Sequence, residues 1–338
     1  MNGSEVVEID PFDDEQFDQW FSVQRIKDQE RRPDLPGWQR AELLAWGRLV
    51  DGAERTQPVL ARDAAGQPIG ISHLETFTTE NQHLGRTEIY VVPSARRQGV
   101  GRALLAAIEE MASNGGRTQL AARDEEPTRP DFVSHAKPFA ESNGFRPVQV
   151  MVRRELTLPL GDQQRRTLLE NPKTSPVGYS IETFDDRWPD GDVADRAELG
   201  RRMSTDAPHE GQDLDEEVWT PERVRQMEAL LASQNRAKLI AAARDDTSGE
   251  VVAFSEIAVP LGAPESVWQH DTLVLREHRG HGLGYALKMA NLIALGDRYP
   301  AARRLSTWNA AENEPMIAVN DEMGFEVTAH STTWMKAL

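Results

Sequence analysis

Residues 86–101 read RTEIYVVPSARRQGVG, and residues 269–284 read QHDTLVLREHRGHGLG. Each stretch begins with strand-forming residues, continues through a polar turn with arginines, and ends in a Gly-x-Gly that opens a helical apolar pattern. Gly99 and Gly282 lie 183 residues apart, and the Asn-Gly-Phe at 143–145 matches the Met-Gly-Phe at 323–325 at nearly the same spacing. Solenoid repeats have periods of about 20–50 residues, so this repeat indicates two duplicated domains.

The segment between the two copies has the composition of a linker. The stretch LTLPLGDQQRRTLLENPKTSPVG, residues 156–178, is polar and contains three prolines and two glycines, with room for one short helix. A chain of 338 residues is long enough for two domains, which usually run about 100–150 residues each. We therefore expect an N-terminal domain over residues 1–157, a linker over 158–178 and a C-terminal domain over 179–338.

Both halves predict the same order of elements. Each continues after its first strands with a strand, the glycine turn, a helix, a strand, a helix and a final strand. This order indicates an α/β fold in which each domain has a mixed central sheet flanked by helices. The earlier elements are predicted as a strand at 6–10, helices at 16–27 and 39–49 and strands at 57–62 and 68–76 in the first half, and a strand at 179–183, helices at 192–203 and 221–233 and strands at 237–244 and 250–259 in the second.

Charge and composition exclude several classes of protein. Lys and Arg total 38 against 55 Asp and Glu, and the resulting charge of −17 disfavours nucleic acid as a partner. No run approaches the roughly 20 apolar residues of a membrane span, and the N-terminus carries no secretory pattern, so we expect a cytoplasmic protein. With no cysteine there is no disulfide or thiolate nucleophile, and the eight histidines do not cluster, so we expect no metal site.

The glycine turn has the parts of a pyrophosphate site. Glycine allows a tight bend and a close approach of a ligand, and the first N–H groups of the following helix point outward with the positive end of its dipole. A plain tight turn remains the alternative for either copy taken alone. The first turn adds the cations Arg96, Arg97 and Arg102, and the second has Arg279.

Two other phosphate-binding motifs are excluded. A Walker-type loop needs Gly-Lys-Ser/Thr, which neither copy contains. A dinucleotide fingerprint needs a third glycine, but Leu104 and Tyr285 occupy the two positions concerned.

The spacing resembles the acyl-CoA loop of the GNAT superfamily, Arg/Gln-x-x-Gly-x-Gly/Ala. Residues 96–101 and 279–284 match it, each lies between a predicted strand and a predicted helix, and each is followed some forty residues later by a Gly-Phe. The resemblance covers nearly the whole chain and is strongest to tandem actinobacterial acetyltransferases of the mycothiol synthase-like type. It implies direct transfer of an acetyl group from acetyl-CoA to an amine of a small molecule or peptide.

The resemblance also implies the residues that bind the cofactor. In the family, backbone groups of the strand before the loop pair with the pantetheine arm, and the loop holds the pyrophosphate. The matching positions are Val91, Val92, Arg96, Arg97, Gly99, Val100, Gly101 and Arg102 in the first half, and Val274, Leu275, Arg279, Gly280, His281, Gly282, Leu283 and Gly284 in the second. An asparagine that holds the pantetheine arm is matched in the second half by Asn309, Asn313 or Asn320.

Direct transfer needs a base for the incoming ammonium but no covalent nucleophile. The family's carboxylate, four residues before the pantetheine-pairing position, is matched by Glu88 and Asp271, although each could instead be a solvated strand residue. Glu256 is a second candidate base, with an exposed salt bridge as its alternative role. The family's tyrosine that protonates the CoA thiolate is absent, because Ala140 and Asn320 stand at its two positions.

The two halves differ in a way that favours the second for catalysis. The first half has no asparagine in the region that matches Asn309. His135 could take the place of that asparagine, but a surface position at the start of a helix explains this histidine more simply. Trp268 and Trp308 are predicted either to line the substrate pocket or to lie in the core. The alternative to an enzyme is a non-catalytic acyl-CoA-binding or sensing protein, which the missing tyrosine favours. A flavin or nucleotide enzyme is disfavoured by the doubled loop.

Overall fold

The computed structural model describes residues 4–49, 53–206 and 214–338. These residues form two compact units. The first contains the chain up to Met151 together with Ala329–Leu338, and most of the remainder, from Val152 to Thr328, forms the second. Among the described residues, no helix is both long enough and apolar enough to span a bilayer.

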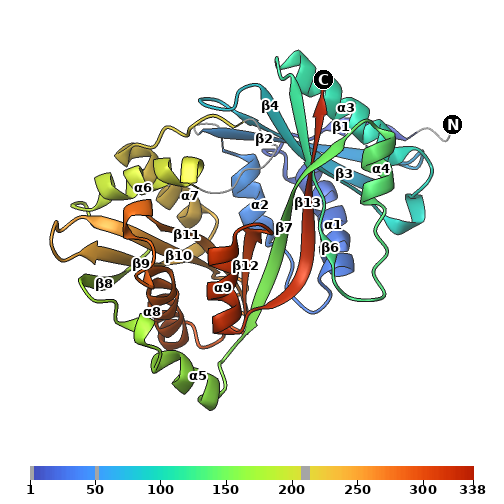
Figure 1. The fold of residues 1–338 in the computed structure, drawn as a ribbon. Helices are drawn as coiled ribbons and strands as arrows, with labels where there is room; N and C mark the ends of the chain where they lie inside the picture. The colour runs from blue at the N-terminus through green and yellow to red at the C-terminus, as the bar shows by residue number, and fades with distance from the viewer. Residues whose placement is uncertain (1–3, 50–52, 207–213) are drawn as a thin grey trace. The chain divides into compact units, whose positions relative to one another are not determined.

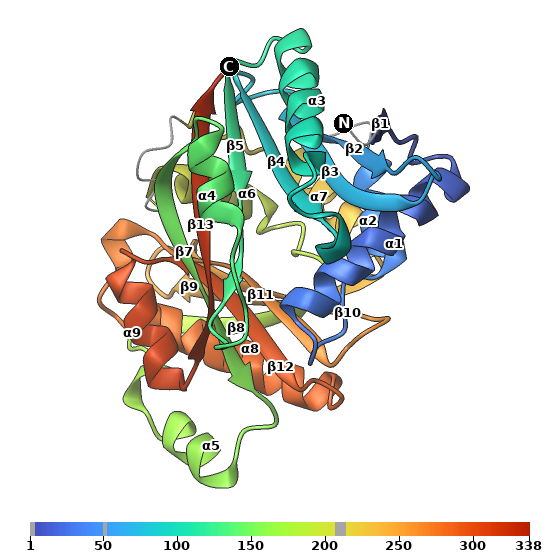
Figure 2. The same cartoon turned by 90° about the vertical axis from the view of Figure 1, so that its right-hand side faces the viewer.

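The first unit is a mixed sheet with helices on both faces (Figures 1 and 2). Its strands follow the order β1-β2-β3-β4-β5-β13, and all pair antiparallel except β4 with β5. Its elements are β1 (Glu5–Glu8), α1 (Asp14–Arg31), α2 (Arg40–Gly47), β2 (Glu54–Arg62), β3 (Pro68–Phe77), β4 (Leu84–Val91), η1 (Pro93–Ala95), α3 (Val100–Asn114), β5 (Gln119–Arg123), β6 (Glu126–Pro127), α4 (Ala136–Ser142) and the end of β13 (Glu326–Ala337).

The second unit repeats this arrangement. Its strands follow the order β8-β9-β10-β11-β12-β7, and β11 pairs parallel with β12. Its elements are the end of β7 (Arg146–Thr157), α5 (Asp162–Leu169), η2 (Pro172–Thr174), β8 (Tyr179–Asp185), α6 (Val193–Asp206), α7 (Pro221–Ser233), β9 (Arg236–Asp245), β10 (Val251–Pro260), β11 (Ser266–Val274), η3 (Arg276–His278), α8 (Leu283–Arg298), β12 (Arg304–Ala310) and α9 (Glu314–Met323). The predicted fold class, two tandem mixed α/β domains, is confirmed.

Local sequence explains why the helices form where they do. Asp13 caps α1 because its carboxylate accepts the backbone N–H groups of Glu15 and Gln16. Helix α3 is strongly amphipathic and buries Val100, Leu104, Leu105, Ile108 and Ala112. Leu104 and Val100 lie against Gly70 of β3, whereas His73 of the same strand faces Trp46 of α2. Helices α3 and α2 therefore cover opposite faces of the first sheet.

The final strands of the two units are exchanged. The end of β13 pairs with β5, from Thr333 opposite Arg123 to Ala337 opposite Gln119, and so completes the first unit. The end of β7 lies next to β12 and belongs to the second unit. Local patterns identify strands but not their partners, so the sequence predicted two final strands and not this exchange. The domain boundaries at 157 and 179 stay a prediction about folding units.

The segment predicted as a linker is structured. It contains α5 and η2, and Leu158 and Leu168 join the apolar core of the second unit. The backbone N–H of Leu158 donates to the carbonyl of Arg303. Figure 1 shows this segment beside α8.

Candidate functional site

Both predicted loops adopt the same strand–turn–helix geometry. Gly99 caps the N-terminus of α3 with a φ of 90°, and Gly282 caps α8 with a φ of 78°. Two residues earlier, Arg97 and Gly280 also have positive φ, at 63° and 86°. Left-handed conformations turn the chain sharply between strand and helix, and the first N–H groups of each helix have no partner within that helix.

The first loop opens onto a cavity of about 660 Å³. A Cβ placed on Gly99 would meet nothing within 4 Å, so the backbone there is accessible to a ligand. The walls come from the end of α1, the end of β4, the loop, the start of α3, the segment between β5 and α4, and helix α4 itself. Lining residues include Ile89, Tyr90, Val91, Arg97, Gly99, Gly101, Arg102, Asp124, Phe132, His135, Phe139 and Asn143.

Strand β4 separates from β5 along this cavity. Their parallel ladder runs from Leu84 and Gln119 to Thr87 and Ala122, whereas β4 itself continues to Val91. Backbone polar groups beyond Thr87 on that edge therefore need partners other than β5. An extended ligand with amide groups can supply them.

The three arginines of the first loop have different roles. Arg97 and Arg102 are exposed, and their side chains make no hydrogen bond or ion pair with any residue that the structure describes. Arg96 instead donates from Nε to the carbonyl of Val91, at 3.0 Å, and pairs with Glu30 of α1. Tyr90 donates its hydroxyl to the same carboxylate at 2.6 Å. Arg96 therefore fixes the loop, and the two free cations are available to an anion.

The matching arginine of the second loop is used in the same way. Arg279 donates from Nε to the carbonyl of Val274, at 3.1 Å, and its guanidinium pairs with Asp206 at 3.0 Å. The backbone N–H of Leu275 donates to Val252, as that of Val92 donates to Ile69. The pattern Arg-x-x-Gly-x-Gly thus includes an arginine that is structural in both copies.

The second loop differs in charge and in access. Gly280 and Tyr285 stand where the first loop has Arg97 and Arg102, so the two free cations are missing. Tyr285 is buried, and Leu283 is buried as Val100 is in the first copy. A Cβ on Gly282 would meet Lys173 of η2 at 3.1 Å, whereas one on Gly284 would meet nothing within 4 Å. His281 packs near the ring of Tyr179, at 5.4 Å.

Glu88, the predicted base of the first half, lies in an ion-pair cluster. Lys27 contacts it at 2.8 Å, and Arg31 contacts its other oxygen. Burial by itself raises the pKa of this carboxyl, but Lys27 and Arg31 more than offset it and hold the pKa well below its ordinary value. A carboxylate with so little affinity for a proton is a weak general base.

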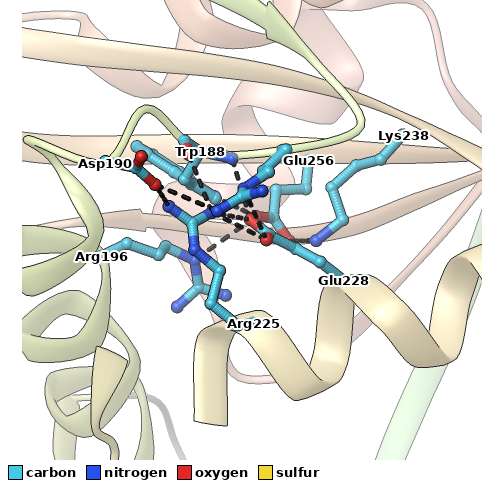
Figure 3. Close-up of polar contacts among 8 residues, drawn as sticks. Trp188, Asp190, Arg196, Arg225, Glu228, Lys238 and Glu256 are labelled. Atoms are coloured by element: carbon cyan, nitrogen blue, oxygen red, sulfur yellow. Dashed lines mark hydrogen bonds and ion pairs between the residues drawn. The ribbon is translucent and has the colours of Figure 1, made fainter. Parts of the chain in front are cut away.

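Glu256, the second candidate base of the C-terminal half, is buried and not exposed. Figure 3 shows it among Trp188, Arg196 and Lys238. Its oxygens accept from Trp188 Nε1 at 2.8 Å, from Arg196 Nε at 3.3 Å and from Lys238 Nζ at 3.2 Å. Burial by itself raises the pKa of Glu256. The positive charges of Lys238 and Arg196 lower the pKa by more than burial raises it, so it lies well below its ordinary value. Glu256 therefore forms salt bridges, as its alternative role predicted, but it forms them in the interior and not at an exposed position.

Asp271, the other predicted base, lies at an irregularity of β11. The β10–β11 register shifts between Ser255 and Ile257, and the exposed His270 and Asp271 lie in the corresponding part of β11. Surrounding protein atoms raise the pKa of Asp271, partly opposed by Arg196. A raised pKa suits a proton acceptor, and the role of Asp271 stays a prediction.

The predicted asparagines have separate structural roles. Asn320 is fully buried, accepts from Lys288 Nζ at 2.6 Å and donates to Asn309 at 3.2 Å. Desolvation lowers the pKa of Lys288 to about 7. Asn313 caps α9 by accepting the backbone N–H of Met316. Their contact with pantetheine stays a prediction.

The sequence left the roles of Trp268, Trp308 and His135 open. Trp268 and Trp308 stack on each other with ring centroids 5.2 Å apart, and Trp268 is buried. His135 precedes α4 as an exposed residue and lines the first cavity.

Sequence reasoning missed Asp124, which follows β5 and lines the first cavity. It is 6% exposed and accepts from the backbone N–H of Thr332, at 2.9 Å, and from Trp334 Nε1, at 3.0 Å. Burial raises the pKa of its carboxyl. The only local signal was an acid directly after the strand that follows the loop helix, and its partners lie more than 200 residues away in the chain.

The duplicated mixed sheet, with a glycine turn that opens a helix beside a separated strand, defines an acyltransferase fold. Known proteins agree: residues 55–147 match the acetyltransferase (GNAT) domain and residues 204–325 the acetyltransferase (GNAT) family. A mycothiol acetyltransferase from Thermomonospora curvata is 30% identical over 246 residues, which cover 70% of this chain and 69% of that protein. The chain belongs to the GNAT acetyltransferase family and carries two such domains in tandem.

Solved structures show the same fold over the whole chain. A tandem GNAT protein from the clavulanic acid biosynthesis pathway has a TM-score of 0.79 and 26% identity, with 99% of this chain and 98% of that one covered. A GCN5-related N-acetyltransferase from Sphaerobacter thermophilus has a TM-score of 0.67 and 19% identity, with 99% and 95% covered. No group of three or more potential metal-ligating His, Asp or Glu side chains occurs within the described ranges.

We predict that Glu256→Ala lowers the free energy of unfolding by about 3–5 kcal/mol, because Arg196 and Lys238 lose their buried counter-charge. Urea unfolding measures this, and Glu250→Ala, at an exposed position, is the control. Because the folded pKa is depressed, the stabilisation by Glu256 is present above its ordinary pKa of 4.5 and is lost as the pH falls further. Equal stability of wild type and Glu256→Ala at pH 7 would contradict this account.

Proposed function

We propose that the chain transfers an acetyl group from acetyl-CoA to an amine of a small molecule or peptide, and that the first unit holds the donor. The observation that carries this proposal is the open cavity at Gly99, bounded by the free edge of β4 and by the N-terminus of α3. This assignment reverses the preference for the second half that the sequence suggested. The second loop is covered by Lys173 and lacks the two free cations.

The residues around the cavity suit the chemistry of acetyl-CoA. The N–H groups at the start of α3 and the cations Arg97 and Arg102 would hold the pyrophosphate. The unpaired edge of β4 up to Val91 would pair with the amides of the pantetheine arm. The thioester supplies the activated acetyl group when bound, and the protein has to orient it and to accept a proton from the amine.

Asp124 is our proposed proton acceptor. It lines the cavity, its raised pKa gives it the affinity for a proton that Glu88 lacks, and its oxygens keep lone pairs free after accepting from Thr332 and Trp334. Glu88, which the resemblance to the family implied, is the competing candidate. Neither needs a covalent intermediate, which suits a chain without cysteine.

A non-catalytic acyl-CoA-binding protein is the second candidate. The observation in its favour is that Ala140 and Asn320 stand at the positions of the family's proton-donating tyrosine. Thiol release from acetyl-CoA in the presence of a panel of amines decides between the two functions, because a binding protein gives no amine-dependent release.

We predict that Gly101→Trp weakens acetyl-CoA binding by about 100-fold or more. The indole would fill the cavity beside Phe139 and displace at least two charge-assisted hydrogen bonds, each worth about 1.5–3 kcal/mol. Isothermal titration calorimetry measures the dissociation constant. Gly284→Trp, at the matching position of the second loop, is the control and should bind as the wild type does. The reverse pattern would assign the donor to the second unit.

We predict that Asp124→Asn lowers kcat by about 10²- to 10⁴-fold while the dissociation constant of acetyl-CoA stays within about twofold. The wild-type rate should rise with pH as Asp124 loses its proton, and Asp124→Asn should lose this dependence. Glu88→Gln should reduce stability and keep the pH dependence. Thermal unfolding confirms that each variant is folded. If Glu88→Gln abolishes the pH dependence and Asp124→Asn retains it, Glu88 is the base.

A further inference from the structure

The segment with α5 and η2, residues 158–178, occupies the place in the second unit that the acyl-CoA cavity occupies in the first. We propose that it is a built-in occupant that closes the second groove, so that the chain binds acyl-CoA at one of its two loops. This inference rests on the proposed function of the first unit. Because the two units are copies of one another, each position of the closed groove has a matching position in the open one.

On one side the segment is held by α8. The hydroxyl of Tyr285 donates to the carbonyl of Leu168 at 3.0 Å, and both residues are buried. Lys173 lies with its Cβ and Cγ 3.1 Å from the place of a Cβ on Gly282, and its ammonium is 5.8 Å from the ring of Tyr285. The backbone of the second loop therefore faces Lys173, whereas the backbone at Gly99 faces open space.

On the other side the segment is held by α9. Glu322 accepts from Lys173 Nζ at 2.6 Å and from Asn171 Nδ2 at 2.7 Å. Gln164 of α5 donates to the carbonyl of Met323 at 3.2 Å. Leu168 lies in an apolar cluster with side chains of both helices, among them Tyr285, Met289 and Met323. The segment is thus wedged between α8 and α9 by polar contacts at its surface and by an apolar anchor inside.

The matching positions in the first unit line the open cavity. The loops repeat after 183 residues, so Tyr285 corresponds to Arg102. The Gly-Phe pairs repeat after 180 residues, so Glu322 and Met323 correspond to Ser142 and Asn143. Arg102, Ser142 and Asn143 all line that cavity. The second unit thus differs from the first at three positions of the groove, Tyr285, Glu322 and Met323, and each of these residues contacts the segment. This pattern indicates that the second groove is adapted to the segment.

The charges point in the same direction. Glu322 is a carboxylate where the first unit has the neutral Ser142, so it would repel a phosphate but attracts the ammonium of Lys173. The hydrogen bond from Lys173 keeps the pKa of Glu322 below its ordinary value. The second groove therefore prefers a cationic peptide segment to an anionic cofactor.

The first test is the stoichiometry of acetyl-CoA binding by calorimetry. Wild type should bind one equivalent. The variant Leu168→Ala, Lys173→Ala, Glu322→Ser removes the anchor and the cover and restores the serine of the first unit, and it should bind two. The matched control Leu169→Ala, Arg166→Ala, Glu326→Ser changes exposed neighbours and should bind one. Two equivalents in wild type, or one in a folded opened variant, would overturn the proposal.

A second measurement keeps the proposal testable if the opened variant does not fold. Amide hydrogen exchange of the wild type follows the segment directly. Addition of acetyl-CoA should slow exchange at the start of α3 and leave exchange in residues 158–178 unchanged. Faster exchange in residues 158–178 on addition of acetyl-CoA, together with slower exchange at the start of α8, would overturn the proposal.

These experiments separate this inference from the proposed function. No binding by wild type, together with one equivalent in the opened variant, would refute the first unit as the donor site and leave the closure of the second groove standing. Binding of one equivalent by wild type that persists in Gly101→Trp and speeds hydrogen exchange in residues 158–178 would refute both.

Discussion

The left-handed turn at Gly99 and Gly282 is the constraint on which the rest of each unit depends. Because glycine adopts a positive φ without the penalty of a Cβ, the chain can leave a strand and start a helix whose first N–H groups lie at the turn. The arginine three residues earlier, Arg96 or Arg279, fixes this turn through the strand carbonyl and an acidic residue of the first long helix. In the first unit the separated edge of β4 and the cavity lie next to this turn.

Much of this arrangement could be predicted from the sequence, because it is local. The spacing of the glycines and the apolar periodicity gave the duplication, the strand–turn–helix units and elements close to those observed, such as helix α7 at Pro221–Ser233. The acidic residues Glu88 and Glu256 were correctly placed on strands. Their ion pairs could not be predicted, because Lys27 and Arg196 come from helices 60 residues or more away.

The two loops are distinguished by contacts between residues that lie far apart in the chain. Lys173 covers Gly282 from a segment whose composition is that of a linker, and Trp334 reaches Asp124 through a strand exchange that no local pattern encodes. From the sequence, the asparagines favoured the second half as the catalytic one. In the structure two of these asparagines, Asn309 and Asn320, form a hydrogen bond with each other in the interior. Duplication gives two copies of a binding motif, and packing decides which copy a ligand can reach.

A crystal structure of the chain with acetyl-CoA would show which of the two loops holds the donor. We expect one molecule, with its pyrophosphate at the start of α3 near Arg97 and Arg102 and its pantetheine arm along the free edge of β4, while α5 and η2 stay on α8. A molecule bound at Gly282 with Lys173 displaced, or acetyl-CoA in both units, would contradict it.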